Sequence, residues 1–200
     1  RYIANRSSGK QGHAIAAALS RMGAETTLVS GPTQLGDPPG VATRRIETAA
    51  EMLAACQGSL PVDVAVFAAA VADWAVAKPA NHKIKKDESQ RPPVLELAAN
   101  PDILKTVSNA GINRPKLVIG FAAETENLVE YARAKLHAKG CDWILANDVS
   151  QGTGTFGGDR NTIHLVTRGD SEDWPTLGKS EVAERLGRRI AAHFGRAANA

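Results

Sequence analysis

The chain has 200 residues, of which 43% are hydrophobic, so it is long enough for one globular domain with a full apolar core. Its net charge of +3 is too small to indicate a nucleic-acid partner by itself, and no apolar run reaches the ~18 residues that a membrane-spanning helix needs. The two cysteines, Cys56 and Cys141, form no C-x-x-C or zinc-ligand spacing, which agrees with a reducing compartment and predicts a cytoplasmic protein.

The first distinctive stretch is Asn-Arg-Ser-Ser-Gly-Lys-Gln-Gly at residues 5–12, which leads into an amphipathic helix that ends near Gly23. Hydroxyls, glycines and a lysine at a helix start favour an anion cradle, because free backbone N–H groups and the positive end of the helix dipole face the same point. The alternative is an ordinary capped helix start with Ser7 or Ser8 as the N-cap residue. The stretch matches neither familiar phosphate loop, so its spacing leaves both interpretations open.

The following elements alternate as in an α/β fold. A strand over 25–30 comes directly after the first helix, which is half of a βαβ unit and predicts a further strand upstream. The chain begins with Arg1 rather than Met, so we expect it to be a fragment of a longer protein. A helix is predicted over 48–57, where Thr48 and Glu51 have the spacing of a capping box.

A nearly unbroken apolar run over 63–70 predicts a strand that is buried on both faces. A weaker strand signal covers 94–97, and the next helix opens with Asn100 as its N-cap residue and Pro101 in its first turn. The remaining predicted elements are strands over 116–123, 142–146 and 161–167, a helix over 126–139, and a final helix that places Val182, Leu186, Ile190 and Phe194 on one face.

Alternation of helices with buried strands predicts a doubly wound α/β fold with a mostly parallel, Rossmann-like sheet, whose N-terminal strand is missing from this fragment. In such sheets, ligands bind beyond the carboxyl ends of the strands. Four stretches fall at positions of that kind, namely 5–10, 70–73, 121–124 and 147–148. Their convergence predicts a domain that binds a phosphorylated, nucleotide-like ligand.

Two groups of lysines have both a structural and a functional interpretation. Lys83, Lys85 and Lys86 form a basic run in a Pro-bounded loop, which is either a solvated loop or a strap that closes over an anionic ligand. Lys135 and Lys139 lie one turn apart on one helix face, which is either a solvated face or a phosphate clamp.

Two aspartates lie at the ends of predicted elements. Asp73 either turns the chain or binds a ribose, a base or a cation, whereas Asp102 stabilises the dipole of the helix that follows it. No Ser-His-Asp or Cys-His arrangement can be argued from spacing, and the five histidines show no metal-binding spacing. The residues alone therefore indicate ligand binding without a side-chain nucleophile.

The chain also resembles a known family through motifs that occur in order. These are RYIANRSSGK at 1–10, AAVADW at 69–74, KIKK at 83–86, NPDI at 100–103, GFAAET at 120–125 and ANDVS at 146–150. They are similar to those of the phosphopantothenoylcysteine synthetases (phosphopantothenate–cysteine ligases), in particular to the C-terminal half of the bacterial bifunctional decarboxylase/synthetases of coenzyme A biosynthesis. The resemblance covers about residues 1–165, and the final helix fits by position. It implies a ligase domain over 1–196 and a frayed tail over 197–200.

The resemblance implies a ligation in two steps. CTP activates the carboxylate of 4′-phosphopantothenate as an acyl-cytidylate and releases pyrophosphate, and the amine of cysteine then attacks the acyl carbon and expels CMP. Positioned cations and amide donors suit both steps, because both develop negative charge on oxygen. An NAD(P)-dependent reductase on the same kind of sheet and a non-catalytic nucleotide-binding module are the alternatives, and the lack of G-x-G-x-x-G in the loop at 5–12 counts against the reductase.

The resemblance also assigns residues. Asn5 is expected to hold and polarise the acyl intermediate, and Lys83 to contact the CTP phosphates and help to form the cytidylate. The remaining cytidine and phosphate contacts are expected from Ala68, Ala69, Ala70, Asp73, Pro101, Asp102, Ile103, Leu104, Phe121, Lys135 and Lys139, with Ala70 also beside the acyl substrate.

The family implies partners as well. Mg²⁺ is expected on the triphosphate, with no protein ligand assigned, and no flavin is expected on this half. We expect a homodimer with substrate pockets near the subunit interface, and a flavin-dependent decarboxylase domain upstream in the full-length chain. One departure is that the Gly-Gly-Thr turn of the family, which precedes the block at 1–10, is not in this sequence. Part of the phosphate site is therefore expected to lie upstream.

Overall fold

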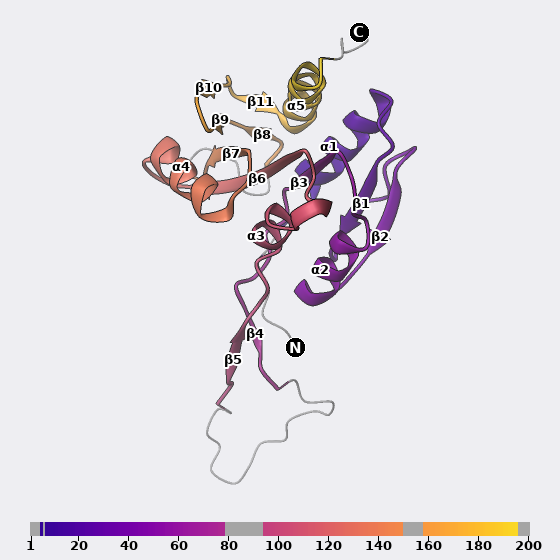
Figure 1. The fold of residues 1–200 in the computed structure, drawn as a ribbon, viewed down its shortest axis with the longest axis vertical. Helices are drawn as coiled ribbons and strands as arrows, with labels where there is room; N and C mark the ends of the chain where they lie inside the picture. The colour runs from indigo at the N-terminus through magenta and orange to yellow at the C-terminus, as the bar shows by residue number, and fades with distance from the viewer. Residues whose placement is uncertain (1–4, 6, 79–93, 150–157, 196–200) are drawn as a thin grey trace.

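The structure is a computed structural model, and it describes residues 5, 7–78, 94–149 and 158–195 (Figure 1). The predicted lysine strap, with Lys83, and the tail over 197–200 lie outside the described residues. The helices are α1 (Lys10–Arg21), α2 (Ala49–Gln57), α3 (Ile103–Ser108), the short 3-10 helix η1 (Gly111–Asn113), α4 (Leu128–Lys139) and α5 (Lys179–His193). The strands are β1 (Thr27–Ser30), β2 (Ala42–Arg45), β3 (Val64–Phe67), β4 (Trp74–Val76), β5 (Leu97–Ala99), β6 (Leu117–Glu124), β7 (Trp143–Asp148), β8 (Arg160–Asn161), β9 (Ile163–Thr167), β10 (Ser171–Asp173) and β11 (Leu177–Gly178).

A central sheet with the strand order β10-β9-β7-β6-β3 organises the molecule. Strands β3, β6 and β7 are parallel, whereas β9 and β10 continue the sheet in antiparallel fashion. The first four residues of β6 and of β7 are buried, as expected for strands that helices cover on both faces. The prediction of a doubly wound, mostly parallel α/β fold is confirmed.

Alternate residues of β6 face two separate apolar cores. Leu117 and Ile119 pack with the buried faces of α1 and α5, where the predicted stripe of Val182, Leu186 and Ile190 is confirmed. On the other face of the sheet, Val118 and Ala122 of β6 pack with Ala132 and Leu136 of α4. The period of two in the strand and the apolar stripes of the helices therefore match.

The strand predicted over 63–70 differs from the expectation. Only Val64–Phe67 form β3, and all four residues are half-buried rather than buried. The reason is that, among the described residues, β3 pairs only with β6 and forms one edge of the central sheet, while β1 and β2 make a separate parallel pair. Whether an upstream strand joins these sheets stays a prediction.

Two helix starts correct the sequence-based interpretation. The N-cap residue of α1 is Gly9, in a left-handed conformation (φ 71°), and neither Ser7 nor Ser8 caps the helix. The N-cap residue of α3 is Asp102, whose side chain accepts from the Lys105 N–H, so Asn100 is not the cap. Asn100 instead directs its amide to another loop, as described below.

The predicted start of α2 is confirmed. The Thr48 hydroxyl accepts from the Glu51 N–H at 3.1 Å, and the Glu51 carboxylate accepts from the Thr48 N–H at 2.9 Å. These two bonds satisfy two backbone donors at the helix start, as a capping box does.

Strands β4 and β5 form an antiparallel two-stranded ribbon that extends away from the helices and the central sheet (Figure 1). Trp74 pairs with Ala99 and Val76 with Leu97. The sequence missed β4 and placed β5 at 94–97, because isolated short strands carry little periodic signal. Trp74 remains 54% exposed and Leu97 46% exposed, so the ribbon presents apolar side chains to solvent. None of the helices in the described ranges is long and apolar enough to cross a membrane.

Candidate functional site

The parallel strands β3, β6 and β7 end at one edge of the central sheet, and the segment that follows β3 lies there. This segment, residues 68–73, begins with three alanines, of which Ala69 and Ala70 are exposed, and it ends with the exposed Asp73. Helix α1 approaches its start closely, because a Cβ placed on Gly12 would lie 3.9 Å from the Ala68 Cβ. Small side chains leave the backbone of this segment accessible to a ligand.

Three successive carbonyl groups of this segment accept hydrogen bonds from two asparagines. Asn5 Nδ2 donates to the Val71 oxygen at 3.1 Å, and Asn100 Nδ2 donates to the Ala72 oxygen at 2.8 Å. The backbone N–H of Asn100 donates to the Asp73 oxygen, also at 2.8 Å. The structure therefore brings the predicted site residue Asn5 to the predicted segment at 68–73, although they are far apart in the sequence.

The start of α3 brings together two further predicted residues. Asp102 Oδ1 accepts from the Lys105 N–H at 3.0 Å, and its Oδ2 lies 2.5 Å from Lys139 Nζ in the last turn of α4. Burial acts to raise the pKa of Asp102, but the hydrogen bonds and charges of Lys139 and Lys105 outweigh it, so the net pKa is lowered. Asp102 is therefore a charged N-cap residue of α3. The other predicted lysine, Lys135, lies one turn before Lys139 in α4.

Leu104 and Phe121 lie on opposite faces of the central sheet. Leu104 packs directly on β6 at Gly120, where an added Cβ would lie 2.7 Å from Leu104 Cδ2. Phe121, the next residue of β6, packs against the core on the side of α1 and α5. The structure does not bring the Phe121 side chain to the start of α3, and its contact with cytidine stays a prediction.

A second cluster at the start of α1 was missed by sequence reasoning. Lys10 Nζ lies 2.6 Å from Asp159 Oδ1, and Asp159 also accepts a backbone hydrogen bond from Lys179 at the start of α5. The hydrogen bond and the charge of Lys10 lower the pKa of Asp159. Burial, followed by the charge of Lys10, lowers the pKa of Lys179. Because 149 residues separate Lys10 from Asp159, no local motif signals this pair.

Two open cavities of about 510 Å³ each lie among the described residues. One lies between the first turns of α1 and α5 and is lined by Lys10, His13, Asp159 and Lys179, among others. The other lies at the carboxyl ends of β1 and β2, and its lining includes Thr33, Arg45, Glu47 and Glu51. Neither lining includes the segment at 68–73 or the start of α3.

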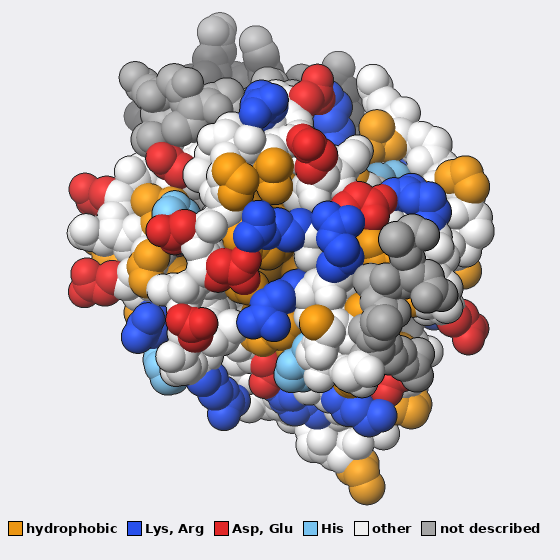
Figure 2. Space-filling view, turned by 90° about the horizontal axis from the view of Figure 1, so that it is seen from above, with side chains coloured by type: hydrophobic (Ala, Val, Ile, Leu, Met, Phe, Trp, Pro, Cys, Tyr) orange, Lys and Arg blue, Asp and Glu red, His pale blue; other side chains and the backbone are white. Residues whose placement is uncertain are grey.

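The surface charges around α5 are mixed. Figure 2, which looks at the molecule from above, shows Lys and Arg side chains interspersed with Asp and Glu. Arg21 pairs with Glu184, and Arg185 Nη2 lies 2.6 Å from Glu172 Oε1. This face carries no broad patch of one sign, which agrees with the small net charge.

A family model described as the DNA/pantothenate metabolism flavoprotein C-terminal domain matches residues 1–194 of this chain. The chain is 43% identical over 196 residues to the coenzyme A biosynthesis bifunctional protein CoaBC of Escherichia coli (strain K12). That alignment covers 97% of this chain and 48% of the relative. The chain therefore spans about half the length of the curated relatives that it matches.

Solved structures share the fold. A crystal structure of the C-terminal domain of a CoaBC protein is 37% identical, with a TM-score of 0.76, over 98% of this chain and 87% of that chain. A Cab2 mutant in complex with phosphopantothenate-cysteine shares the fold at 15% identity, with a TM-score of 0.67, over 98% of this chain and 82% of that chain. The chain belongs to the DNA/pantothenate metabolism flavoprotein C-terminal domain family.

Proposed function

We propose that this chain ligates cysteine to 4′-phosphopantothenate at the expense of CTP, in the cytoplasm, as a step of coenzyme A biosynthesis. The observation that carries the proposal is the segment at 68–73, which exposes Ala69, Ala70 and Asp73 and is held by Asn5 at the carboxyl edge of the parallel strands. The E. coli relative is named a coenzyme A biosynthesis protein, and phosphopantothenate-cysteine is bound in the Cab2 neighbour. The names of these two proteins support a ligase whose product is phosphopantothenate-cysteine.

The first proposed step joins the substrate carboxylate to CTP. A carboxylate oxygen attacks the α-phosphorus, the bond from that phosphorus to the β-phosphate oxygen breaks, and pyrophosphate leaves with the electron pair. Negative charge grows on the phosphate oxygens, so cations and helix N-termini near them lower the barrier. Lys139 beside the start of α3 is one such cation, and Lys83, which lies outside the described residues, is proposed as another.

The second proposed step transfers the acyl group. The amine of cysteine attacks the acyl carbon, the carbon–oxygen bond to the cytidylate breaks, CMP leaves, and the amine loses a proton. The hydrogen bond from Asn5 Nδ2 to the Val71 oxygen at 3.1 Å supports a role of Asn5 in this step, because it fixes the orientation of the amide beside the exposed Ala70. A fixed amide dipole can stabilise a developing oxyanion without reorganising.

We also propose Mg²⁺ as the counter-ion of the CTP phosphates, and no flavin on this half. Protein-bound Mg²⁺ commonly uses one or two carboxylates together with substrate phosphates. In the part of the chain that the structure describes, no group of three His, Cys, Asp or Glu side chains gathers as a metal site. We therefore propose that the nucleotide phosphates supply most of the ligands of the Mg²⁺ ion. The exposed Asp73 is the carboxylate at this edge of the sheet. When bound, Mg²⁺ would offset the charge of the phosphates.

A homodimer is part of the proposal, together with a decarboxylase domain upstream in the longer chain. The ribbon of β4 and β5 exposes Trp74 and Leu97, and it begins one residue after Asp73. Leu95, two residues before β5, is exposed as well. Covering these side chains with a second copy would remove apolar surface from water, which favours association. The ribbon would then place the subunit interface next to the ligand segment.

The test uses the full-length protein with CTP, 4′-phosphopantothenate, cysteine and Mg²⁺. We expect equal amounts of CMP and pyrophosphate, and pyrophosphate release limited to about one equivalent per site when cysteine is left out. A well-folded dimer that releases no CMP would contradict the ligase, and hydride transfer from NAD(P)H to a dye would favour the reductase.

Two variants separate the steps. Asn5→Asp is expected to form pyrophosphate but to stall before the product, because the fixed amide donor is lost. Lys83→Ala is expected to slow pyrophosphate formation, whereas Lys78→Ala, at an 87% exposed lysine that pairs with Glu96, serves as its matched control. Normal turnover by Asn5→Asp, or an unchanged first step in Lys83→Ala, would remove the corresponding role.

A further inference from the structure

Asn100 makes two contacts with the same loop, although sequence patterns assign it only to a helix cap. Its side-chain amide donates to the Ala72 oxygen and its backbone N–H donates to the Asp73 oxygen, both at 2.8 Å. Asp102 caps α3, so helix formation does not account for the Asn100 side chain. The amide of Asn100 serves the loop at 71–73 instead.

The loop depends on donors from outside itself. Val71 and Ala72 have no polar side chains, and the loop lies between β3 and β4 without belonging to either strand. Asn100 reaches it from across the β4–β5 ribbon, and Asn5 holds the preceding carbonyl, that of Val71. These three hydrogen bonds fix three successive peptide groups.

Fixing the carbonyls also fixes the opposite side of each peptide group. In a planar trans peptide, the C=O bond and the following N–H bond point in opposite directions. The backbone N–H groups of Ala72 and Asp73 therefore point away from the two asparagines that hold the carbonyls. The orientation of the segment toward a ligand thus depends on Asn5 and Asn100 together.

We infer that Asn100 is a positioning residue for the nucleotide site, and this inference rests on the proposed function. Asn100 acts through the loop, not by touching CTP: it holds Ala72 and Asp73 so that Ala70 and Asp73 face the nucleotide. An amide is required because the acceptor is a carbonyl. An aspartate of the same shape would set a carboxylate oxygen against the Ala72 oxygen.

Substitution isolates the side-chain contact, because every variant except proline keeps the backbone N–H that donates to Asp73. In the full-length protein, Asn100→Asp is expected to lower kcat/KM for CTP about tenfold, since one hydrogen bond is replaced by a repulsion. KM for cysteine is expected to stay unchanged. Asn100→Gln keeps a donor and is expected to recover part of the loss.

The matched control is Asn109→Asp at the other end of α3. Its side-chain amide donates to the Lys105 oxygen at 2.7 Å. This variant therefore removes a similar amide-to-carbonyl hydrogen bond at α3, but away from the loop at 71–73. Thermal unfolding of all variants reports the folded fraction. Asn100→Asp is expected to lose affinity for CTP at an assay temperature where both Asp variants are fully folded, and the control is expected to keep wild-type kinetics.

A spectroscopic readout does not depend on turnover. The nitrogen of Asp73 belongs to the same peptide group as the Ala72 carbonyl, so its ¹⁵N shift in aspartate-labelled protein reports the Asn100 contact. We expect Asn100→Asp, but not Asn109→Asp, to move this resonance. If the wild-type protein releases no CMP, the proposed function fails, and this resonance still decides whether Asn100 positions the loop.

Any of the following results would overturn the inference: an unmoved Asp73 resonance in Asn100→Asp, an unchanged kcat/KM for CTP in an active enzyme, or a loss of activity that matches the loss of folded protein. The last result would make Asn100 a stabilising residue only. A loss shared equally by Asn109→Asp would have the same meaning.

Discussion

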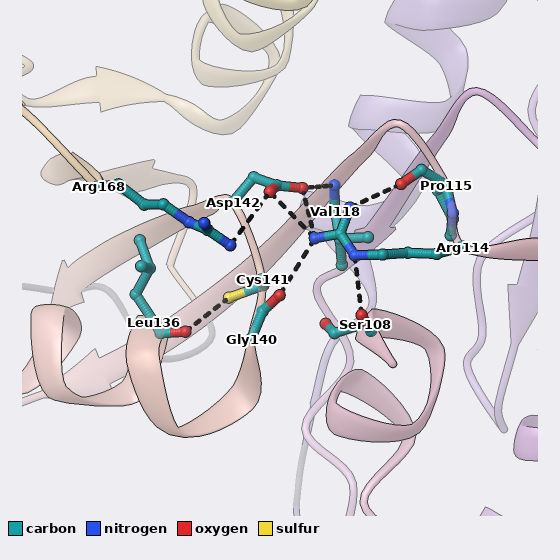
Figure 3. A network of polar contacts seen from close by, with 9 residues as sticks. All are labelled: Ser108, Arg114, Pro115, Val118, Leu136, Gly140, Cys141, Asp142 and Arg168. Atoms are coloured by element: carbon teal, nitrogen blue, oxygen red, sulfur yellow. Dashed lines mark hydrogen bonds and ion pairs between the residues drawn. The ribbon is translucent and has the colours of Figure 1, made fainter. Parts of the chain in front are cut away.

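The central sheet has different contacts at the two ends of its parallel strands, β3, β6 and β7. At the amino end of β6, Arg114 donates from Nε to the Ser108 oxygen at 2.8 Å and from Nη2 to the Gly140 oxygen at 3.1 Å (Figure 3). Arg114 Nη2 also lies 2.9 Å from Asp142 Oδ2, and the same oxygen accepts the Val118 N–H at 2.8 Å. Both charged side chains are only 25% exposed. This cluster ties the ends of α3 and α4 to β6.

At the carboxyl end, neutral amides from Asn5 and Asn100 hold a loop whose side chains are small or exposed. Half-buried charges that pair with each other stabilise an arrangement and offer few free atoms to a ligand, whereas backbone groups beside exposed alanines remain accessible. The difference indicates that the amino end secures the scaffold and the carboxyl end presents the proposed ligand surface.

The largest expected effect is on stability, at the amino end. Arg114→Ala leaves the Asp142 carboxylate without its closest cation and removes donors from three carbonyls, so the free energy of unfolding should fall by about 3 kcal/mol. Denaturant unfolding measures this change. Arg168→Ala is the control, because Arg168 is 68% exposed and 4.0 Å from Asp142, and its loss should cost under about 0.5 kcal/mol. Equal costs for the two variants would contradict this difference between the two ends.

The second effect connects the two ends through the middle of β6. Gly120→Ala would place a Cβ 2.7 Å from Leu104 Cδ2 and 2.9 Å from Ile144 Cδ1, so the side chains of Leu104 in α3 and Ile144 in β7 must shift. Overpacking of this kind should lower the free energy of unfolding by ~1–3 kcal/mol and weaken CTP binding in titrations. Gly169→Ala, where an added Cβ meets no atom within 4 Å, should change neither quantity. Unaltered CTP binding in Gly120→Ala would separate α3 from the site.

The third effect is a pH dependence at the start of α3. The net pKa of Asp102 is lowered in the folded protein, so its charge contributes stability above its ordinary value of 3.8, and that contribution is lost as the pH falls through the lower folded value. Between about pH 6 and pH 2, the free energy of unfolding should therefore fall less in Asp102→Asn than in the wild type. Identical pH profiles would show that the contact with Lys139 does not stabilise the charge.

The smallest effect is chemical, beside the Arg114 cluster. Burial is the largest cause that raises the pKa of Cys141 to about 11, so only about one thousandth of this thiol is thiolate at pH 8. Iodoacetamide should therefore leave Cys141 unlabelled in the folded protein and label it after unfolding, as measured by peptide mass spectrometry. Cys56→Ser serves as the control because it removes the other thiol. Rapid labelling of native Cys141 would show that this end opens readily.

Local sequence patterns predicted the elements whose signals lie within a few neighbouring residues. Apolar runs located β6 and β7, and the Thr48–Glu51 spacing located the start of α2, because both signals lie within one element. The same reasoning misplaced the cap of α3, since Asn100 and Asp102 are both good cap residues and only the loop at 71–73 decides between them. The pairing of Lys10 with Asp159 had no local signal at all.

By itself, the sequence determined the alternation of helices and strands, the apolar faces that meet in the two cores, and the motifs that led to the family. Periodicity and motifs can be recognised in the sequence alone because each depends on residues that are near neighbours along the chain. The contacts of Asn5 with Val71 and of Lys139 with Asp102 arise only in the folded chain, as does the packing of Phe121 on the face of the sheet opposite Leu104. These contacts join residues from different elements, so they exist only once the sheet has set the distances between them.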